Sequence, residues 1–449
     1  MEVLTRKIKI FYALGQLGWS MLASISGTWF IYFFLPPEGA NINVVIPQEG
    51  MFLGFTLIGL IMGIGTLVDA LSGPYIANIS DKSNSPLGRR IPFLRKSALP
   101  FSLFLVLSFC VPYQAGIHTI NIVWLLIVFP LYFLAFSAYV IPYTALLGEL
   151  GQTTEDRIDL STYISVTWFI GFVIPTFASN IWDLLIKAFN LPKTNAIQIT
   201  FIILATIAFF LMLIPAYTID EKKYCRANSS KMDMKSAVKS VIKNVDFKYF
   251  LYSEFGYCLA NTLFQTSLVY YITVLAGLSE NNVGLVVTIV GILSFLMYPM
   301  INKLSKKYGK KTLMVISLVT FIISFVYIAL MGKLPFGGFY QLIPVIILSA
   351  IPAAISGVLP NAITADCAVY DAKESSENKE ALYFGVRSFI GKIGNAISIV
   401  ILPSILMLGK SSSNDIGIRL SVIFASFAAL FSLLTFMKYN EKRILEKID

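Results

Sequence analysis

Two of the ionisable residues inside the long apolar segments of this sequence are the main candidates for function, and Glu254 and Arg387 also lie in such segments. Asp69 lies in the segment 51–79, and Lys392 lies in the segment 382–409. An ionised side chain in hydrocarbon costs about 2.5–3.5 kcal/mol on insertion scales, so such residues are candidates for function. If both face one cavity, a proton or cation that binds Asp69 would release Lys392 and change which conformation is favoured. The alternative is a static interhelical ion pair, or a lysine that extends to the membrane surface.

Uncharged hydrogen-bonding and aromatic side chains form a second group of candidates. They gather in the corresponding segments 11–35 and 249–276, and they suit a neutral polyol or glycoside better than a strongly anionic substrate. Tryptophan usually anchors the ends of apolar segments. Trp168 is the exception, because it lies in the middle of the segment 161–186. The alternative for the whole group is that it joins helices through hydrogen bonds. The candidates for substrate contact are Gln16, Trp19, Trp168, Asn261 and Gln265.

A short basic loop between two apolar segments carries the third group. Asp81 is followed there by Gly88, Arg89 and Arg90. We expect Asp81 to accept hydrogen bonds from a neighbouring helix N-terminus, and the arginines to reach carboxylates or phosphates, which together would clamp a gate. Attraction to the inner membrane surface would explain the arginines but not Asp81. A similar loop later in the chain carries Lys306 in place of Asp81, so the clamp is expected to be asymmetric.

The composition predicts that membrane-spanning helices carry these residues. Of the 449 residues, 56% are hydrophobic and 13% are charged, whereas a soluble protein usually has about 25% charged residues. Apolar stretches of about 20 residues recur, and each can cross about 30 Å of hydrocarbon. The sequence therefore predicts an all-α polytopic membrane protein with twelve transmembrane helices, at 11–35, 51–79, 95–113, 120–148, 161–186, 197–217, 249–276, 283–301, 312–331, 339–365, 382–409 and 417–437.

The chain also repeats itself at about half its length. Residues 74–82 have an echo at 299–307, and the Gly-Arg-Arg at 88–90 has its counterpart in the Gly-Lys-Lys at 309–311. Two membrane-embedded halves related in this way are typical of a transporter that rocks about a substrate site between its repeats.

The predicted domains are an N-terminal six-helix bundle at 1–219, a linker at 220–248 and a C-terminal six-helix bundle with a short tail at 249–449. An even number of spans places both termini on one side, and most of the 35 Lys and Arg residues lie on that side. This asymmetry predicts cytoplasmic termini in an inner or plasma membrane. The residues assigned to loops on the opposite side are Lys187, Lys193, Lys333, Lys410 and Arg419.

The net charge of +10 follows from this topology and does not indicate a nucleic-acid partner. The linker is strongly basic, and its apolar residues are spaced for an amphipathic helix on the anionic lipids of the inner leaflet. A solvated linker is the alternative.

Catalysis, metal binding and cofactors are not indicated. Cys110, Cys225, Cys258 and Cys367 are scattered without metal-ligand spacing, and His118 is the single histidine. No nucleophile–base pair lies in or beside the spans, and no glycine-rich ATP-binding loop is present. The chain is therefore not expected to be an enzyme, and a gradient would supply the energy for transport.

Three runs of residues in this sequence form recognisable motifs. The runs are Asp69-Ala70 with Gly73-Pro74, Ser80-Asp81-Lys82 and Gly88-Arg89-Arg90-Ile91-Pro92-Phe93; Ile141-Pro142-Tyr143-Thr144-Ala145-Leu146-Leu147 with Glu155-Asp156-Arg157-Ile158-Asp159-Leu160-Ser161; and Ala365-Asp366, Tyr370-Asp371 and Glu380-Ala381-Leu382-Tyr383-Phe384-Gly385-Val386 with Lys392. They resemble the motifs of the glycoside–pentoside–hexuronide cation symporters, a melibiose-permease-like family of the major facilitator superfamily. They stand in the family's order and cover both halves of the chain.

The resemblance implies the major facilitator fold with two six-helix halves, and cation symport by alternating access in a monomer surrounded by membrane lipids. The motifs of the family also imply a cytoplasmic gate that includes the residues of the clamp and three further charged residues. The gate consists of Asp81, Arg89, Arg90, Arg157, Asp366 and Asp371.

The chain departs from melibiose permease at the sodium and sugar sites. Positions that carry further carboxylates in that type fall on Gly73, Leu17 and Val140, and its sugar-stacking tryptophans fall on Thr144 and Gly357. A sodium site normally needs several oxygen ligands, so a site of that type is not expected. Asp69 and Lys392 remain as candidates for coupling to a proton, and an uncoupled facilitator stays open.

The sequence therefore predicts a secondary active transporter, a sugar or glycoside symporter coupled to a proton or, as the second choice, to sodium. Two alternatives stay open: a carrier of lysolipids or other small solutes with the same fold, and a transport-inactive sensor or scaffold. The retained Asp69, Arg157, Asp366 and Lys392 argue against the sensor, because a relative that does not transport has little need of buried charge.

Overall fold

The computed structural model describes residues 4–52, 54–151, 153–225, 243–335, 337–375 and 380–448. Among these residues, twelve helices are long and apolar enough to cross a membrane, which confirms the predicted number. Contacts divide the chain into two compact units, Met1–Ser230 and Lys231–Asp449. Most of the segment expected to be amphipathic, 226–242, lies outside the described residues.

Each unit contains six of the spans. The first unit consists of α1 (Arg6–Phe34), β1 (Gly50–Phe52), β2 (Phe55–Thr56), α2 (Leu57–Asp81), α3 (Ile91–Phe109), α4 (Thr119–Leu150), α5 (Thr154–Val173), η1 (Ile174–Phe177), α6 (Ala178–Phe189), α7 (Lys193–Thr218) and α8 (Glu221–Tyr224). The second consists of α10 (Val245–Tyr270), η2 (Tyr271–Leu275), α11 (Asn282–Tyr308), α12 (Lys310–Leu330), η3 (Gly338–Gln341), α13 (Leu342–Ser375), α14 (Glu380–Leu406), α15 (Ile416–Phe436) and α16 (Glu441–Ile448).

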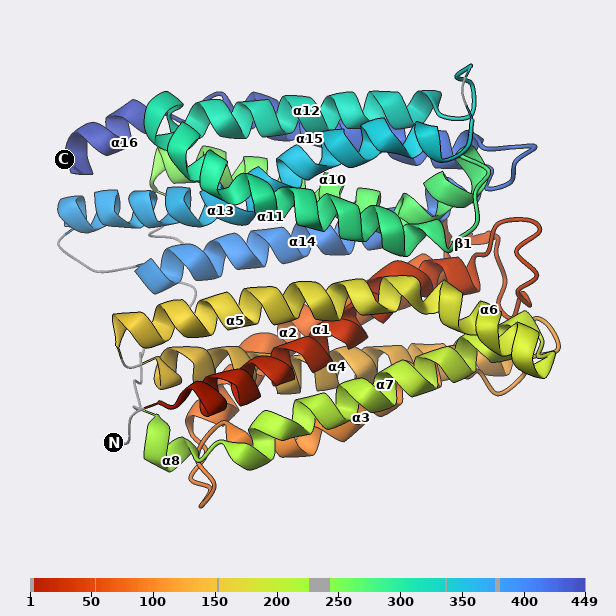
Figure 1. Cartoon of the computed structure of the whole chain (residues 1–449), viewed down its shortest axis with the longest axis horizontal. Coiled ribbons are helices and arrows are strands. Elements are labelled where there is room, and N and C mark those ends of the chain that lie inside the picture. The colour runs from red at the N-terminus through yellow and green to blue at the C-terminus, as the bar shows by residue number, and fades with distance from the viewer. Residues whose placement is uncertain are drawn as a thin grey trace. The chain divides into compact units, whose positions relative to one another are not determined.

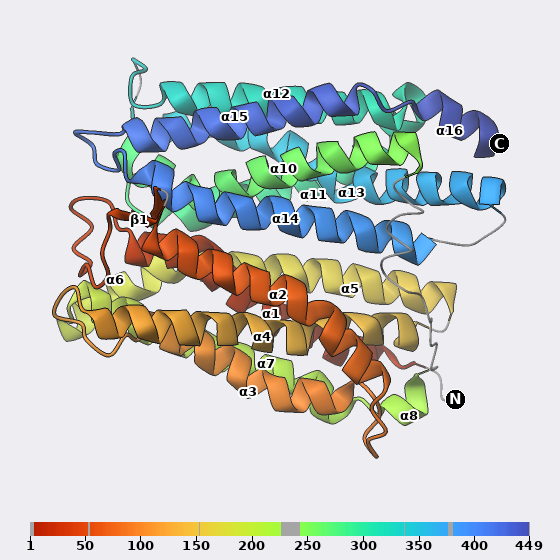
Figure 2. The same cartoon turned by 180° about the vertical axis from the view of Figure 1, so that it is seen from behind.

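The two units share one packing pattern. In the first unit, α1 packs on α5 and α7, α2 packs on α4, and α3 packs on α4 and α7. In the second unit, α10 packs on α14 and α15, α11 packs on α13, and α12 packs on α13 and α15. These contacts correspond one to one in chain order (Figure 1, Figure 2). The repeat seen in the sequence therefore extends to the packing of the helices.

Local chemistry sets where several helices begin and break. The Thr56 side chain accepts a hydrogen bond from a backbone N–H of the first turn of α2 at 3.3 Å. The helix therefore begins after the β1–β2 hairpin, and the start at residue 51 that hydropathy predicts is too early. His118 caps α4 through its Nδ1 at 3.1 Å. At Pro175, which lacks a backbone N–H, the 3-10 turn η1 separates α5 from α6.

A pair of tyrosines joins α1 to α4 in the core of the first unit. Tyr12 and Tyr143 stack with ring centroids 4.4 Å apart, and each hydroxyl donates to the backbone carbonyl of the other residue at 2.6 Å. Both side chains are fully buried, so the exchange satisfies two hydroxyl groups that have no access to solvent.

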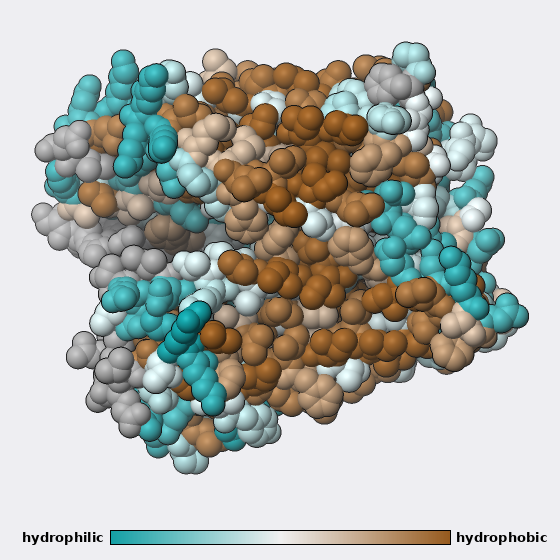
Figure 3. Space-filling view, viewed as in Figure 1, coloured by the Kyte–Doolittle hydropathy of each residue, from teal (hydrophilic) through white to brown (hydrophobic). Residues whose placement is uncertain are grey.

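The surface of each unit fits a hydrocarbon environment. Apolar side chains gather over the middles of the helices, and hydrophilic side chains gather at the helix ends (Figure 3). Phe210 on α7 is 60% exposed and Phe427 on α15 is 64% exposed. Large exposed apolar surfaces of this kind indicate contact with acyl chains.

A glutamate closes the N-terminus of α3. Glu221 of α8 accepts hydrogen bonds from the backbone N–H groups of Arg89, Arg90 and Ile91 at 2.7, 2.8 and 3.0 Å. The carboxylate thus bonds donors that a helix leaves unpaired at its start, and it lies at the positive end of the helix dipole. The expectation that Asp81 plays this part is corrected for α3, because Glu221 occupies the position.

The second unit repeats the arrangement with Glu441 of α16, which accepts from the backbone N–H groups of Lys310 and Lys311 at 2.7 and 2.9 Å. A glycine with positive φ precedes each capped helix, Gly88 at 103° and Gly309 at 85°. A Cβ atom would lie 2.3 Å from the capping carboxylate at Gly88 and 2.8 Å from it at Gly309. The glycines therefore allow the carboxylates to approach the helix ends.

We predict that Gly88→Ala destabilises the protein by about 1–3 kcal/mol, since the residue has a positive φ and its new methyl group would displace Glu221. Thermal unfolding of the purified protein measures the loss. Gly116→Ala is the control, because its Cβ meets nothing within 4 Å. Equal melting temperatures for the two variants would contradict the role given to Gly88.

Candidate functional site

A serine of the neighbouring helix holds the carboxyl group of Asp69. Ser137 of α4 donates from its Oγ to Oδ1 of Asp69 in α2 at 2.5 Å. Ser137 is buried, and Asp69 is partly buried. This hydrogen bond joins α2 to α4 within the membrane-spanning segments, and the Asp69 carboxyl group stays the candidate for coupling.

Trp19 of α1 lies beside α4 at the level of Ser137. Its ring packs edge-on against Phe136, the residue before Ser137, with centroids 6.0 Å apart. The indole Nε1 is buried and has no hydrogen-bond partner among the residues that the structure describes. Gln16, one turn earlier on α1, is also buried. A buried indole N–H usually has a partner, and that of Trp182 in α6 also has none among the described residues, so Trp19 is distinguished by its place beside α4.

The second unit holds a charge cluster whose members are not among the site residues predicted from the sequence. Arg387 of α14 donates from Nε to Oε1 of Glu254 in α10 at 2.8 Å, and from Nη1 to Oδ1 of Asn361 in α13 at 2.7 Å. The side chains are 8% exposed for Glu254 and 17% exposed for Arg387. One guanidinium thus joins three membrane-spanning helices, and protonation of Glu254 would weaken the joint.

The remaining coupling and substrate candidates have varied surroundings. Lys392 is partly buried on α14 of the second unit, whereas Asp69 belongs to the first unit, so their coupling stays a prediction. On α10, Asn261 is partly buried and Gln265 is exposed. Trp168 on α5 is 43% exposed and stacks on an aromatic neighbour at 5.4 Å.

Three of the predicted gate residues form an ion cluster where α2 ends, α3 begins and α4 ends. Arg90 donates to Asp81, and its Nε donates to Oε1 of Glu149 at 3.1 Å. Arg89 reaches the same oxygen at 3.0 Å. Arg90 and Glu149 are buried, so each guanidinium needs this carboxylate to balance its charge. Glu149 is not among the gate residues predicted from the sequence.

A smaller version of this cluster lies in the second unit. Lys310 at the start of α12 donates to Asp366 in α13, as Arg89 at the start of α3 pairs with Glu149 in α4. The third helix is therefore tied to the fourth in both units. The clamp is asymmetric at Asp81, which Lys306 replaces in the second unit. The ion pair between the third and fourth helices is present in both units.

The two remaining predicted gate residues, Arg157 and Asp371, lie near helix ends, and an ion cluster formed by Lys9 surrounds the position of Arg157. Lys9 of α1 donates to Asp156 at 2.8 Å and to Asp159 at 2.7 Å, and its hydrogen bond holds the pKa of Asp156 below the usual value. Arg157 lies between these aspartates in α5, and its side chain is outside the part that the structure describes. Asp371 is partly buried near the end of α13.

Two kinds of signal could have identified the missed residues. The run at 220–223 (Asp-Glu-Lys-Lys) is echoed at 440–443 (Asn-Glu-Lys-Arg), so the half-length repeat marks both capping glutamates. Glu254 and Arg387 carry the signal of charge inside apolar spans. Their contact with each other depends on which helices are neighbours, and no local pattern gives that.

These clusters provide hydrogen bonds, fixed charges and groups that can be protonated. Within the described ranges, no group of three or more His, Cys, Asp or Glu residues is placed to hold a metal ion.

Comparison with known proteins gives relatives of one kind. The family described as MFS/sugar transport protein matches residues 11–437. An isoprimeverose transporter of Lactiplantibacillus pentosus is 23% identical over 416 residues, which cover 90% of this chain and 80% of that protein. A lactose permease of Leuconostoc lactis is 22% identical over 470 aligned residues, which cover 98% of this chain and 70% of that protein.

Solved structures share the fold at low sequence identity. The nucleoside transporter NupG superposes with a TM-score of 0.67 at 14% identity, covering 97% of this chain and 100% of that chain. The inward-open xylose transporter XylE from E. coli gives 0.66 at 15% identity, covering 98% of each chain. These relatives are transporters, and they confirm the expectation that the chain is not an enzyme.

We predict that Glu254→Ala destabilises the protein by about 3 kcal/mol, because it leaves the Arg387 guanidinium buried without its carboxylate. The double variant Glu254→Leu/Arg387→Leu removes both charges and should recover most of the loss. Thermal unfolding in detergent measures both changes.

The matched control is Asp415→Ala, which removes a carboxylate that is more exposed than that of Glu254, 28% against 8%, and leaves Arg419 its hydrogen bond to the carbonyl of Met331. It should cost about 1 kcal/mol or less. A double variant that is no more stable than Glu254→Ala would contradict the account of this pair.

Proposed function

Because this chain belongs to the MFS/sugar transport protein family, a group of glycoside–pentoside–hexuronide-type symporters with the major facilitator fold, it is a multi-pass membrane transporter, and we propose that it carries a neutral sugar or glycoside together with a proton. The transport mechanism is alternating access, in which the two repeats rock about the substrate. The protein acts as a monomer in the inner or plasma membrane, with both termini in the cytoplasm.

The sugar assignment draws on the names and the chemistry of the relatives. The two similar proteins of Lactiplantibacillus pentosus and Leuconostoc lactis are named for the saccharides isoprimeverose and lactose. NupG is named for nucleosides, but its 14% identity supports the fold alone. A neutral saccharide also suits the uncharged donors and acceptors on α1 and α10.

One observation carries the proposal. The Trp19 indole, whose N–H has no partner among the described residues, and the Asp69 carboxyl group contact adjacent residues of α4. Trp19 packs on Phe136, and Asp69 accepts from the next residue, Ser137. A sugar hydroxyl that accepts from the Trp19 indole would lie in the same part of the first unit as Asp69. Sugar binding and protonation can then favour each other through a common change in packing.

The other candidate residues have separate roles in this proposal. Asp69 takes the coupling proton, and Lys392 responds to its charge. Gln16, Asn261 and Gln265 add hydrogen bonds to the substrate, and Trp168 adds an aromatic face. The clusters around Arg90 and Lys310 hold the ends of the helices on the terminal side and form the cytoplasmic gate.

Substrate-dependent thermal stabilisation of the purified protein tests the proposal. The panel contains glycosides, pentoses, hexuronates, nucleosides and lysolipids, each with and without sodium and at two pH values. A ligand that binds only the folded state raises the melting temperature by mass action. Stabilisation by a neutral glycoside, indifferent to sodium, supports the proposal. Stabilisation by nucleosides alone or lysolipids alone would overturn the sugar assignment.

We predict that Asp69→Asn abolishes accumulation of the sugar driven by a pH gradient and preserves exchange of labelled for unlabelled sugar. The reason is that an amide cannot carry the coupling proton, whereas exchange requires no net movement of protons. Uptake into proteoliposomes measures both activities. Glu155→Gln is the control, since Glu155 is an exposed carboxylate in the first turn of α5. Accumulation that survives in Asp69→Asn would exclude this residue as the proton site.

We further predict that Trp19→Phe weakens sugar binding by about tenfold, the usual value of one lost hydrogen bond in a closed site. The phenyl ring keeps the contact with Phe136. Trp182→Phe is the control, because Trp182 packs against Trp29 in the aromatic core at 4.8 Å and should affect stability more than affinity. Unchanged affinity in Trp19→Phe would remove the indole from the site.

A further inference from the structure

The first unit contains a groove that the transport function does not use, where α2 ends and α3 packs on α4. Its volume is about 820 Å³, and its lining comes from these three helices and from the loop between α2 and α3. We propose that this groove binds an anionic phospholipid, with the phosphate group at Lys82 and Lys96 and an acyl chain along the apolar floor. The leaflet is the one on the side of the chain termini.

The floor of the groove is apolar and is open because of small residues on α4. Ala135 and Ala138 lie one turn apart there, while Phe104 of α3 and Leu131 and Leu134 of α4 form larger walls. Leu134 is 41% exposed. A lining of this kind offers an acyl chain continuous apolar contact, whereas a free anion gains nothing from it.

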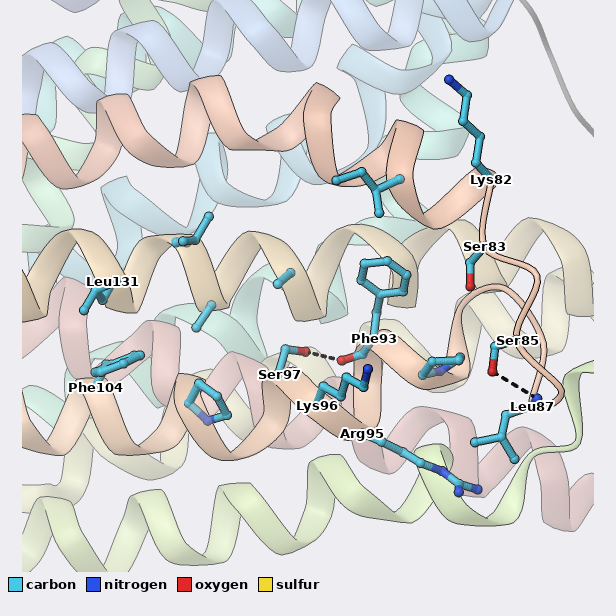
Figure 4. Close-up of a pocket in the computed structure, with 16 residues that line it drawn as sticks. Lys82, Ser83, Ser85, Leu87, Phe93, Arg95, Lys96, Ser97, Phe104 and Leu131 are labelled. Atoms are coloured by element: carbon cyan, nitrogen blue, oxygen red, sulfur yellow. Dashed lines mark hydrogen bonds between the residues drawn. The ribbon is translucent and has the colours of Figure 1, made fainter.

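The mouth of the groove is polar and basic. Figure 4 shows Lys82, Ser83 and Ser85 at the end of α2 and in the following loop, and Phe104 and Leu131 toward the opposite end of the groove. Lys96 lies on α3 between these two ends. The groove is therefore amphipathic along its length, as a phospholipid is.

The two lysines of the groove are available to an anion, and because Figure 4 shows the Lys82 side chain extending away from the groove, Lys82 must change its side-chain conformation to join Lys96 at the phosphate group. Lys82 and Lys96 are exposed, and within the described part of the chain neither forms an ion pair or a hydrogen bond through its ammonium group. The neighbouring arginines differ, since Arg89 and Arg90 pair with Glu149. The positive charges of this region that no carboxylate balances therefore include those of the two lysines that line the groove.

A third basic residue lines the groove but already has partners. The Nε of Arg95 donates to the carbonyl of Ala216 at 2.8 Å, and its guanidinium lies 4.3 Å from the centre of the Tyr217 ring. Figure 4 shows its side chain pointing toward α7. Arg95 therefore contributes positive potential and leaves direct contact to the two lysines. Basic pockets between membrane helices bind anionic head groups in this way.

The test compares lipids that share acyl chains and differ in charge. The purified full-length protein is delipidated in detergent and given phosphatidylglycerol, phosphatidylcholine or glycerol 3-phosphate. Native mass spectrometry counts bound lipid, and the melting temperature reports stabilisation. We expect retention of phosphatidylglycerol over phosphatidylcholine and no stabilisation by glycerol 3-phosphate.

Two variants locate the site. Lys82→Gln/Lys96→Gln should weaken retention of phosphatidylglycerol by roughly tenfold. The control Lys303→Gln/Lys307→Gln removes the same charge from the end of α11, where Lys307 is the repeat counterpart of Lys82, and should leave retention unchanged.

The second variant, Ala138→Phe, fills the floor and should also reduce retention. Its control is Ile127→Phe, which places the same side chain at an exposed position of α4 outside the groove. Equal retention of the two lipids, or retention unaffected by both groove variants, would overturn the proposal. Stabilisation by glycerol 3-phosphate equal to that by phosphatidylglycerol would replace it with a site for a free phosphate.

Discussion

Hydrocarbon offers no hydrogen bonds, so every polar group inside a span must find its partner within the protein. This constraint organises the buried groups described above. Ser137 donates to Asp69, Glu254 and Asn361 accept from Arg387, and the stacked tyrosines of α1 and α4 bond each other's backbone. A group that remains unsatisfied in such surroundings is costly, and the indole N–H of Trp19 is one. In the proposed function, the substrate satisfies it.

The same constraint explains why the ends of the helices carry so much ionic structure. Each unit closes the N-terminus of its third helix with a glutamate from a short helix after its sixth span, and each ties the basic start of that helix to an acidic residue on the fourth. Glycines with positive φ make room for the glutamates. These contacts join segments far apart in the sequence, and they occur in both repeats. A rigid six-helix unit is what a rocking mechanism requires of each repeat.

Much of the fold could be predicted because it depends on local properties of the sequence. Hydropathy predicted the twelve spans, and the echo of residues 74–82 at 299–307 predicted the two repeats. Asp69 was recognisable as a charge in an apolar run. The start of α2 was placed too early because a cap and a short hairpin, both matters of hydrogen bonding, determine it. The pairing of Glu254 with Arg387 depends on the packing of α10 against α14, which one sequence does not contain.

In the proposed function, each neutral sugar that moves through this chain carries a proton with it. The most direct measurement is the pH of a weakly buffered suspension of cells that express the protein, recorded as a transported glycoside is added in the absence of sodium. With proton symport, the medium becomes more alkaline as the sugar enters, and a proton ionophore abolishes the change. Uptake of labelled glycoside without any change in pH would exclude proton symport.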